Sequence, residues 1–539
     1  MNISWSRRFF EELHAEGIRD IVFCPGARNS PLISMLAHTK GFRLHSFFEE
    51  RDAAFFALGL ARRTGEPVAV ITTSGTAAAE CLPAAVEAYH SGVPLLLVTA
   101  DRPRRLRGTG APQAIDQVGL FAKFLQFEID IEDGEPFSLE KWHRRAPVHI
   151  NICFDEPLID EPFEPLELAP APAKPSFAGR SQFMVSAGPE WAVLRLTKFL
   201  KAQESPIIIV GTLETVEERE AVVDFLLKLK APVYLESTSG LREDPRLNEI
   251  SLRSGEKILN WSLRRNLFTG VVRIGGIPTA RIWRDLDERG SAIDVFSLSP
   301  LPFAGLSRGE LVCAEIAPTL RLYHAKREPS PRWQTILMKD RAVESTLLKL
   351  IESEPLAEPS LFNQLSKIVA DAPLVYVGNS LPIREWDLAA SREKIIPVEA
   401  NRGVNGIDGQ IATFFGLVTG ANTHSGENWA IIGDLTALYS LAAPWVLMNG
   451  RKDFSARIVI VNNGGGKIFS RIFKTDLFVN RHAIDFEPWA RFWRLGYQKW
   501  ASIPDSVPPL EKGQVEVIEL IPDEQATKRF WEQYDGFWE

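Results

Sequence analysis

The chain has 539 residues and a formal net charge of −8, with 45% hydrophobic and 24% charged residues. This length exceeds what one hydrophobic core holds, so we expect three or four domains of ordinary globular composition. The acidic balance argues against a nucleic-acid-binding protein, since such proteins usually carry a surplus of basic residues.

The first third of the chain alternates between short apolar runs and helical stretches. The strand-like runs are IRDIVFCPG, PVAVITTSG, VPLLLVTADRP and APVHINICFDEP. Continuous apolar strands separated by helices are typical of a parallel sheet that is covered on both faces. We therefore predict an α/β domain over residues 1–175, with ligands at the carboxyl ends of its strands.

The remainder contains two more blocks of the same kind. Prolines become dense and periodicity is lost between residues 155 and 187, which indicates a linker. Strand-like runs resume in SPIIIVG, APVYLES and GVVRIGG, and a second boundary at 351–360 precedes APLVYVGNS, NWAIIGDLT and ARIVIVNNGGG. We predict a central α/β domain over residues 185–350 and a third over 358–539.

The four cysteines do not form a recognisable site. They are scattered, without a CxxC pair or a neighbouring histidine cluster, so neither a zinc site nor a disulfide framework is expected. The first residues lack the apolar core of a signal peptide, and no uncharged apolar run reaches about 18 residues. These features predict free thiols, a cytoplasmic location and no membrane span.

Two strand ends in the third domain carry polar residues. One apolar run ends in Asp434, and the next ends in Asn463, which three glycines follow. A carboxylate and an amide oxygen at neighbouring strand tips suit Mg²⁺, which usually shares phosphate oxygens. The glycines permit close backbone approach, and the helix after Asp434 presents its N-terminus to an anion. Either dipeptide alone reads as an ordinary turn, but together they predict a Mg²⁺-bridged diphosphate.

The GD and NN dipeptides, in this order and spacing, resemble the motif of the thiamine-diphosphate-dependent enzyme superfamily. The resemblance implies the thiamine-diphosphate-binding fold, with pyrimidine-binding, central and diphosphate-binding α/β domains in the order predicted above. It implies that Asp434, Asn463 and the Gly465 carbonyl hold Mg²⁺ or Mn²⁺. The other residues that it places at the cofactor are Glu50, Gly75, Thr76, Ile407, Gly433 and Leu435.

The resemblance assigns the catalytic role to Glu50. This residue lies at a strand end, where FFEERDAAFFALGLA continues as a helix. In the superfamily a glutamate at this position hydrogen-bonds to N1′ of the aminopyrimidine ring and favours the imino tautomer, which an apolar shell supports. The adjacent Glu49 is interpreted as an acid at a helix N-terminus, stabilised by the macrodipole.

Longer stretches resemble one branch of the superfamily, the 2-succinyl-5-enolpyruvyl-6-hydroxy-3-cyclohexene-1-carboxylate synthases of menaquinone biosynthesis. They include CPGARNSPL, TTSGTAAAE, QAIDQVGLF, VGNSLPIREWD and NRGVNGIDG, and they span nearly the whole chain. The resemblance implies a transferase that decarboxylates 2-oxoglutarate and adds the succinyl carbanion to isochorismate, in a homodimer or homotetramer. Arginine forks suit two such dicarboxylates. The residues implied to line the substrate pocket are Arg28, Gln113, Arg281, Ser380, Arg384 and Arg402.

Some positions depart from the pattern of these synthases. Ala27 and Ala280 stand where the pattern has serine, Arg281 where it has lysine, and Pro112 where it has asparagine. Each departure changes a group that can hydrogen-bond to substrate, worth about 1 kcal/mol or more when buried. These four residues therefore leave the substrate specificity of this chain open.

Two other functions are compatible with the same residues. One is a different thiamine-diphosphate enzyme, such as a 2-oxoacid decarboxylase or an acetolactate synthase. It keeps Glu50, Asp434 and Asn463 but needs no arginine-lined isochorismate site. The other is a catalytically silent scaffold that binds the cofactor, against which the intact acid and metal ligands argue.

Overall fold

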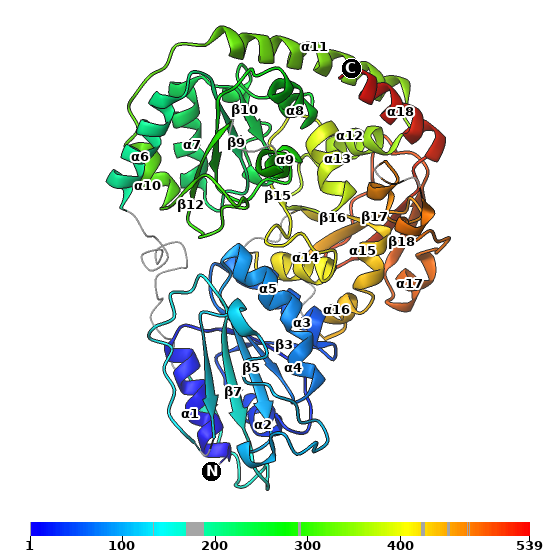
Figure 1. Cartoon of the computed structure of the whole chain (residues 1–539). Helices are drawn as coiled ribbons and strands as arrows, with labels where there is room; N and C mark the ends of the chain where they lie inside the picture. The colour runs from blue at the N-terminus through cyan, green and yellow to red at the C-terminus, as the bar shows by residue number, and fades with distance from the viewer. Residues whose placement is uncertain are drawn as a thin grey trace. The chain divides into compact units, whose positions relative to one another are not determined.

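The computed structural model describes residues 2–132, 134–168, 188–288, 293–421, 426–449, 453–471, 473 and 475–538. Three sheets of five or six strands follow one another along the chain (Figure 1). Close packing divides the chain into two compact units. The first comprises Met1–Gln182, Gly406–His424 and Thr436–Phe454, and the second comprises Phe183–Asn405, Ser425–Leu435 and Ser455–Glu539.

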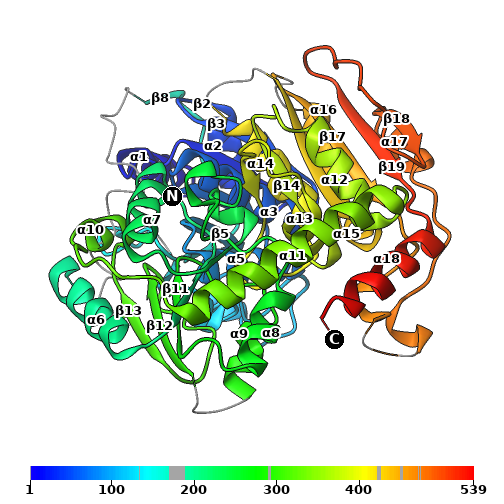
Figure 2. The same cartoon turned by 90° about the horizontal axis from the view of Figure 1, so that it is seen from above.

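The first sheet has the strand order β3-β1-β4-β5-β7-β6, and every neighbouring pair is parallel. Helices α1 and α2 form a core with one face of this sheet, and α3 and α5 pack together on the other face (Figures 1 and 2). The strands are β1 (Asp20–Phe23), β3 (Arg43–Ser46), β4 (Val68–Thr72), β5 (Leu95–Asp101), β6 (Phe127–Ile131) and β7 (Val148–Cys153), with a separate pair of β2 (Thr39–Lys40) and β8 (Leu166–Glu167). The helices are α1 (Asn2–Ala15), α2 (Ser30–Ala37), α3 (Glu50–Thr64), α4 (Thr76–Glu80) and α5 (Leu82–Ser91).

Helix α3 begins at Glu50, and its two ends are set by local chemistry. The Glu49 side chain accepts a hydrogen bond from the backbone N–H of Asp52 at 2.6 Å and so caps the helix. Gly65 ends the helix in the left-handed region, with φ at 67°, which glycine adopts at no steric cost. The predicted helix after Glu50 is therefore present.

Helix α3 packs against α14 (Gln410–Thr419), which comes from the third predicted domain. The two backbones approach closely at two glycines. A Cβ on Gly59 would lie 2.0 Å from the carbonyl oxygen of Thr413, and a Cβ on Gly416 would lie 2.1 Å from that of Phe56. Glycine at both positions is what permits this crossing, because any side chain would overlap the other backbone.

The second sheet has the order β10-β9-β11-β12-β13 and is also parallel. Helices α6, α7 and α10 share a core with one face, and α8, α9, α11 and α18 share a core with the other. The strands are β9 (Pro206–Val210), β10 (Val233–Leu235), β11 (Gly270–Ile274), β12 (Asp294–Ser299) and β13 (Glu310–Cys313). The helices are α6 (Pro189–Ala202), α7 (Val216–Leu229), α8 (Lys257–Arg264), α9 (Ile282–Glu288), α10 (Ile316–Arg321) and α11 (Pro331–Ser353).

The third sheet has the order β15-β14-β16-β17-β19-β18, again parallel throughout. Helices α12 and α13 pack on one face around the buried Trp386. The strands are β14 (Val375–Val377), β15 (Val398–Glu399), β16 (Glu427–Gly433), β17 (Ser455–Val461), β18 (Gly496–Trp500) and β19 (Val515–Leu520). The remaining helices are α12 (Glu358–Ile368), α13 (Leu381–Ala389), α15 (Asp434–Tyr439), α16 (Val446–Asn449), α17 (Glu487–Phe492) and α18 (Glu524–Gly536).

The predicted fold class is confirmed, because the structure consists of parallel sheets with helices between their strands. The predicted domain limits stay a prediction, since α14 packs against α3 of the first unit while the strands on either side of it belong to the third sheet. Among the described residues, no helix has the combination of length and apolar character that crossing a bilayer requires.

Candidate functional site

Asp434 and Asn463 follow two neighbouring strands at the same edge of the third sheet. Strands β16 and β17 pair in parallel register up to their last residues, so the residues after them meet. Asp434 Oδ2 accepts hydrogen bonds from the backbone N–H groups of Gly464 and Gly465, both at 2.9 Å. The structure thus brings the predicted carboxylate into contact with the predicted glycine loop.

The side-chain amide of Asn463 is held at one end only. Its Nδ2 atom donates to both carboxylate oxygens of Glu358, at 3.0 Å each. Its Oδ1 atom is buried and has no hydrogen-bond partner among the described residues. Because amide and carboxylate oxygens are ligands of Mg²⁺ in proteins, this bare oxygen near Asp434 fits a divalent cation.

Gly465 completes the predicted ligand set, and no other residue fits its position. Its φ is 134°, and a Cβ would lie 2.4 Å from the carbonyl oxygen of Val479. Its own carbonyl oxygen accepts from the backbone N–H of Lys467 at 2.9 Å, which leaves a second lone pair. In the part of the chain that the structure describes, no three His, Cys, Asp or Glu residues form a metal-binding group.

Buried negative charge favours a cation at this edge of the sheet. Burial raises the pKa of Asp434, although backbone N–H groups, including that of Leu435 at 2.7 Å, donate to its carboxylate. His482 Nε2 lies 3.3 Å from Asp434 Oδ2. A divalent cation would offset the cost of this buried carboxylate, which agrees with the predicted diphosphate site.

Two carboxyl groups behind Asn463 were not predicted from the sequence. Glu358 begins α12 and Glu385 lies in α13; both side chains are buried, and the two carboxyl oxygens of Glu385 have no hydrogen-bond partner among the described residues. Burial and the charge of Asp434 raise the pKa of Glu358 to about 7, against the hydrogen bond from Asn463, while burial and the charge of Glu358 hold the pKa of Glu385 well above its usual range. Burial therefore disfavours the ionised forms of these two carboxyl groups. Both acids stand in ordinary helical segments, so no spacing in the sequence identifies them.

Glu50 lies where the first sheet meets α3. Its side chain is half-buried, and burial, together with the charges of Glu49 and Glu80, raises the pKa of its carboxyl group. Its charge in turn contributes to the raised pKa of the Cys24 and Cys81 thiols, which places it near the carboxyl end of β1 and the start of α5. A half-buried acid with a raised pKa holds a proton more readily than an exposed one, which suits proton transfer.

Gly75 and Gln113, both predicted site residues, lie close together, and Gly75 is bound by Gln117, which the sequence analysis did not single out. Gln117 Oε1 accepts from the backbone N–H of Gly75 at 2.9 Å, and its Nε2 donates to the Asn151 side chain at 2.8 Å. Gln113 is in the left-handed region, with φ at 55°, and its Cα would lie 3.4 Å from a Cβ on Gly75. Thr76 follows as the first residue of α4. The buried Gln117 therefore links the turn after β4 to the loop after β5.

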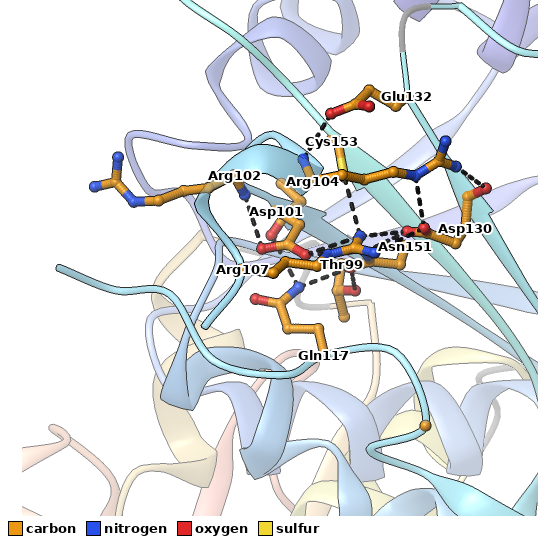
Figure 3. A network of polar contacts seen from close by, with 12 residues as sticks. Thr99, Asp101, Arg102, Arg104, Arg107, Gln117, Asp130, Glu132, Asn151 and Cys153 are labelled. Carbon is orange, nitrogen blue, oxygen red and sulfur yellow. Dashed lines mark hydrogen bonds and ion pairs between the residues drawn. The ribbon is translucent and has the colours of Figure 1, made fainter. Parts of the chain in front are cut away.

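A network of charged groups lies beneath this loop (Figure 3). Asn151 donates to Asp101 at 3.1 Å and to Asp130 at 2.8 Å. Arg107 donates to Asp130 Oδ1 at 2.6 Å, and Arg104 donates to Asp130 Oδ2 at 2.9 Å. Asp130 is thus the carboxylate on which the two arginines of the loop converge, and it ties the loop to the sheet.

Substituting Asp130 with asparagine should lower stability in a pH-dependent way. Burial alone would raise the pKa of Asp130, but hydrogen bonds from Arg107, Asn151 and Arg104 lower it to about 2. Since this folded-state value lies below that of the unfolded chain, the stabilisation is present above about pH 4 and is lost as the pH falls towards 2. We expect Asp130→Asn to lower the melting temperature at pH 7 and to flatten its fall between pH 4 and pH 2.

The exposed pair of Asp155 and Arg105, joined at 2.6 Å, provides the control. Because surface ion pairs contribute little to stability, Asp155→Asn should leave the melting temperature nearly unchanged at pH 7 and between pH 4 and pH 2. Equal effects of the two substitutions would contradict the role assigned to Asp130.

Arg281 and Arg384 gather around one carboxyl group in the second unit. The Arg281 backbone N–H donates to Glu256 at 2.7 Å, and burial raises the pKa of Glu256 while the charges of Arg384 and Arg281 oppose that rise. Arg384 also donates to the carbonyl oxygen of Ser380 at 2.6 Å, and Ser380 has φ at 72°. The Arg281 side chain is 57% exposed and lies 3.6 Å from Asp285. Arg281 thus lies directly before α9, and Arg384 lies in the first turns of α13.

Arg402 is bound to the same region of the second unit. It donates to Asn379 Oδ1 at 2.6 Å and to Thr279 Oγ1, and the Thr279 backbone donates to the buried Glu236. Burial and the charge of Asp387 raise the pKa of Glu236 to about 7, against the opposing charge of Arg402. The loops after β10, β11, β14 and β15 therefore converge on Arg402.

The other predicted residues belong to the first unit. Arg28 is buried, donates to the carbonyl oxygen of Phe154 at 3.0 Å and lies 3.3 Å from Glu156. Ile407 is half-buried in the turn before α14, the helix that packs on α3. The predicted substrate residues therefore fall into two groups: Arg28 and Gln113 in the first unit, and Arg281, Ser380, Arg384 and Arg402 in the second.

Comparison with known proteins identifies the relatives of this chain. The family described as "Thiamine pyrophosphate enzyme, N-terminal TPP binding domain" matches residues 3–120. Three similar proteins are each named 2-succinyl-5-enolpyruvyl-6-hydroxy-3-cyclohexene-1-carboxylate synthase. The protein of Bdellovibrio bacteriovorus is 41% identical over 100% of this chain and 99% of its own. That of Akkermansia muciniphila is 36% identical over 95% of both chains, and that of Chloroflexus aurantiacus is 30% identical over 96% and 93%.

Proposed function

This chain belongs to the family of 2-succinyl-5-enolpyruvyl-6-hydroxy-3-cyclohexene-1-carboxylate synthases, and from this premise we propose that it is a thiamine-diphosphate-dependent transferase of menaquinone biosynthesis. Its substrates would be 2-oxoglutarate, which loses CO₂, and isochorismate, which receives the remaining succinyl unit. Because both substrates are dicarboxylates, cationic side chains would gather at the substrate site even though the chain as a whole is acidic.

The observation that carries the proposal is the bare, buried Oδ1 atom of Asn463 near the Asp434 carboxylate. These two side chains and the Gly465 carbonyl would hold Mg²⁺ or Mn²⁺ and, through it, the diphosphate. Gly433 and Leu435 flank the aspartate at the start of α15. When bound, thiamine diphosphate supplies the carbon nucleophile and electron sink that decarboxylation of a 2-oxoacid needs.

Glu50 would hold a proton at N1′ of the aminopyrimidine ring. Its half-buried position and raised pKa support this role, since a neighbouring charge and an apolar wall strengthen a hydrogen bond to a ring nitrogen. Gly75 and Thr76 would lie along the cofactor, and Ile407 would support its bent shape from below. Each of these three residues is assigned by its place in the sequence motifs.

Arginines would bind the carboxylates of the two substrates. Arg384 already neighbours the partly buried Glu256 and Arg402 the buried Glu236, so each is oriented before a substrate arrives. Arg28, Gln113, Arg281 and Ser380 complete the proposed pocket. The Arg281 guanidinium is exposed and pairs with Asp285, and Ala27, Pro112 and Ala280 remove hydrogen-bonding groups, so the pocket would hold isochorismate differently from the common pattern.

The predicted organisation forms part of the proposal. Residues 1–175 would bind the pyrimidine ring, residues 185–350 would form the central domain and residues 358–539 would bind the diphosphate. The working form would be a homodimer or homotetramer in the cytoplasm, with the pyrimidine-binding domain of one chain facing the diphosphate-binding domain of another. A molar mass in solution that corresponds to an active monomer would contradict this organisation.

An assay with purified protein tests the function. We expect product only when 2-oxoglutarate, isochorismate, thiamine diphosphate and Mg²⁺ are all present, and removal of the cation by a chelator should abolish it. The measurement is product formation by chromatography together with CO₂ release. If isochorismate changes neither CO₂ release nor the products, a general 2-oxoacid decarboxylase is favoured. If the protein binds the cofactor but releases no CO₂, the silent scaffold is favoured.

A further inference from the structure

We propose that Glu358 is a positioning residue that fixes which end of the Asn463 side-chain amide faces the divalent cation. This inference rests on the proposed function, because it assumes that Asn463 is a ligand. It concerns a residue that is not itself a ligand of the metal. Its effect would be on affinity for the cation.

The need for such a residue follows from the chemistry of the asparagine side chain. One end of the amide is an oxygen that can bind a cation, and the other is an NH₂ group that cannot. A rotation of the side chain by half a turn exchanges the two ends with almost no change in shape. A site built on Asn463 therefore binds a cation well only if something favours one orientation.

Glu358 provides that preference because its carboxylate accepts hydrogen bonds. Both of its oxygens lie 3.0 Å from Asn463 Nδ2, and its side chain is only 2% exposed. In the reversed orientation Oδ1 would face two carboxylate oxygens without intervening water. The carboxylate thus holds the NH₂ end and leaves Oδ1 as the buried atom without a partner. A negative charge behind the amide also increases the electron density on Oδ1.

The position of Glu358 is itself fixed. It is the first residue of α12, and its backbone N–H donates to Thr527 Oγ1 in α18 at 2.9 Å. The buried side chain of Glu385, from α13, lies near its carboxyl group. Since α12 and α18 fix its backbone, the carboxylate acts as a rigid support for Asn463.

The neighbouring asparagine offers a matched comparison. Asn462 Nδ2 donates to Glu519 Oε1 at 2.6 Å and to the carbonyl oxygen of Ile484 at 2.8 Å. Glu519 is fully buried, as Glu358 is, and it also accepts from the NH₂ end of an asparagine at the tip of β17. Asn462 is not a predicted ligand, so removing its acid tests the effect of losing a buried carboxylate without altering the metal site.

The experiment measures Mg²⁺ affinity directly. Apo-protein with saturating thiamine diphosphate is titrated with Mg²⁺ by calorimetry, for the wild type, Glu358→Gln and Glu519→Gln. Loss of an outer hydrogen-bond partner of a metal ligand typically weakens binding about 10- to 100-fold, so we expect the Mg²⁺ Kd of Glu358→Gln to rise about tenfold or more. Glu519→Gln should stay within about twofold of wild type, and saturating Mg²⁺ should restore activity to Glu358→Gln.

A double substitution keeps the test decisive if Glu358→Gln does not fold. Asn463→Asp alone would place two carboxylates face to face, whereas Asn463→Asp with Glu358→Gln exchanges donor and acceptor. The double variant should therefore bind Mg²⁺ more tightly than Asn463→Asp alone.

The inference is overturned by a folded Glu358→Gln variant with the wild-type Kd, or by a double variant that binds no more tightly than Asn463→Asp. Failure of the wild type to bind Mg²⁺ with thiamine diphosphate would instead reject the proposed function.

Discussion

Glu50→Gln is expected to reduce the rate of product formation by roughly 10²- to 10⁴-fold, the usual contribution of a positioned acid or base. Glutamine has nearly the same shape as glutamate, but it cannot donate or hold the proton that the proposed mechanism needs at the pyrimidine ring. Burial and the charges of Glu49 and Glu80 already raise the pKa of Glu50, so a neutral side chain is tolerated there. The affinity for thiamine diphosphate should change much less than the rate. Steady-state kinetics and a cofactor titration measure the two effects separately.

The adjacent acid serves as the control for Glu50→Gln. Glu49 caps α3 by accepting from the Asp52 N–H at 2.6 Å, and a Gln at this position keeps a carbonyl oxygen for the same bond. Glu49→Gln should therefore shift the melting temperature slightly and leave most of the activity. A Glu50→Gln enzyme that retains more than about a third of the wild-type rate would remove the catalytic assignment and with it the proposed proton transfer.

The sequence was sufficient to predict the sheets and the strand tips, because both depend on local patterns. Apolar runs such as SPIIIVG and ARIVIVNNGGG became β9 and β17. Parallel strands end at one edge of a sheet, so polar residues after two neighbouring strands must meet there. Asp434 and the glycines after Asn463 are accordingly in contact, which only required that β16 and β17 be neighbours.

Residues that act from distant segments could not be predicted in this way. Glu358 lies 105 positions before Asn463, and Gln117 lies 42 positions after Gly75. Each stands in a segment whose composition is ordinary for a helix or loop, so only the tertiary structure shows that its side chain is buried against the site. Burial changes what these side chains do, because a polar group in the interior must find a partner.

The contact between α3 and α14 could likewise not be predicted from the sequence. Gly59 and Gly416 each lie within an apolar helical run, where glycine reads as a weak helix former. Nothing in either run indicates that it faces another backbone. The segment with α14 was predicted as part of the third domain, but it packs with the helix that carries Glu50.

Gly59→Ala should therefore be strongly destabilising, although alanine is normally favoured over glycine in a helix by up to about 1 kcal/mol. The added Cβ would lie 2.0 Å from the carbonyl oxygen of Thr413 and 2.9 Å from its carbonyl carbon, and backbone atoms cannot move aside as a flexible side chain can. Overpacking of this kind costs about 3 kcal/mol. We expect the midpoint of thermal unfolding to fall by roughly 6–12 °C, measured by calorimetry.

Gly536→Ala serves as the control, because it should not destabilise the protein. Gly536 ends α18, and a Cβ there would meet no atom within 4 Å, so only helix propensity acts and stability should stay the same or rise slightly. Because α3 begins at Glu50, a shift of this helix would also misplace the acid, so Gly59→Ala should lose activity below its new melting temperature. If both alanine variants unfold at the wild-type temperature, the two helices do not cross at these glycines, and the link between α14 and the Glu50 helix must be rejected.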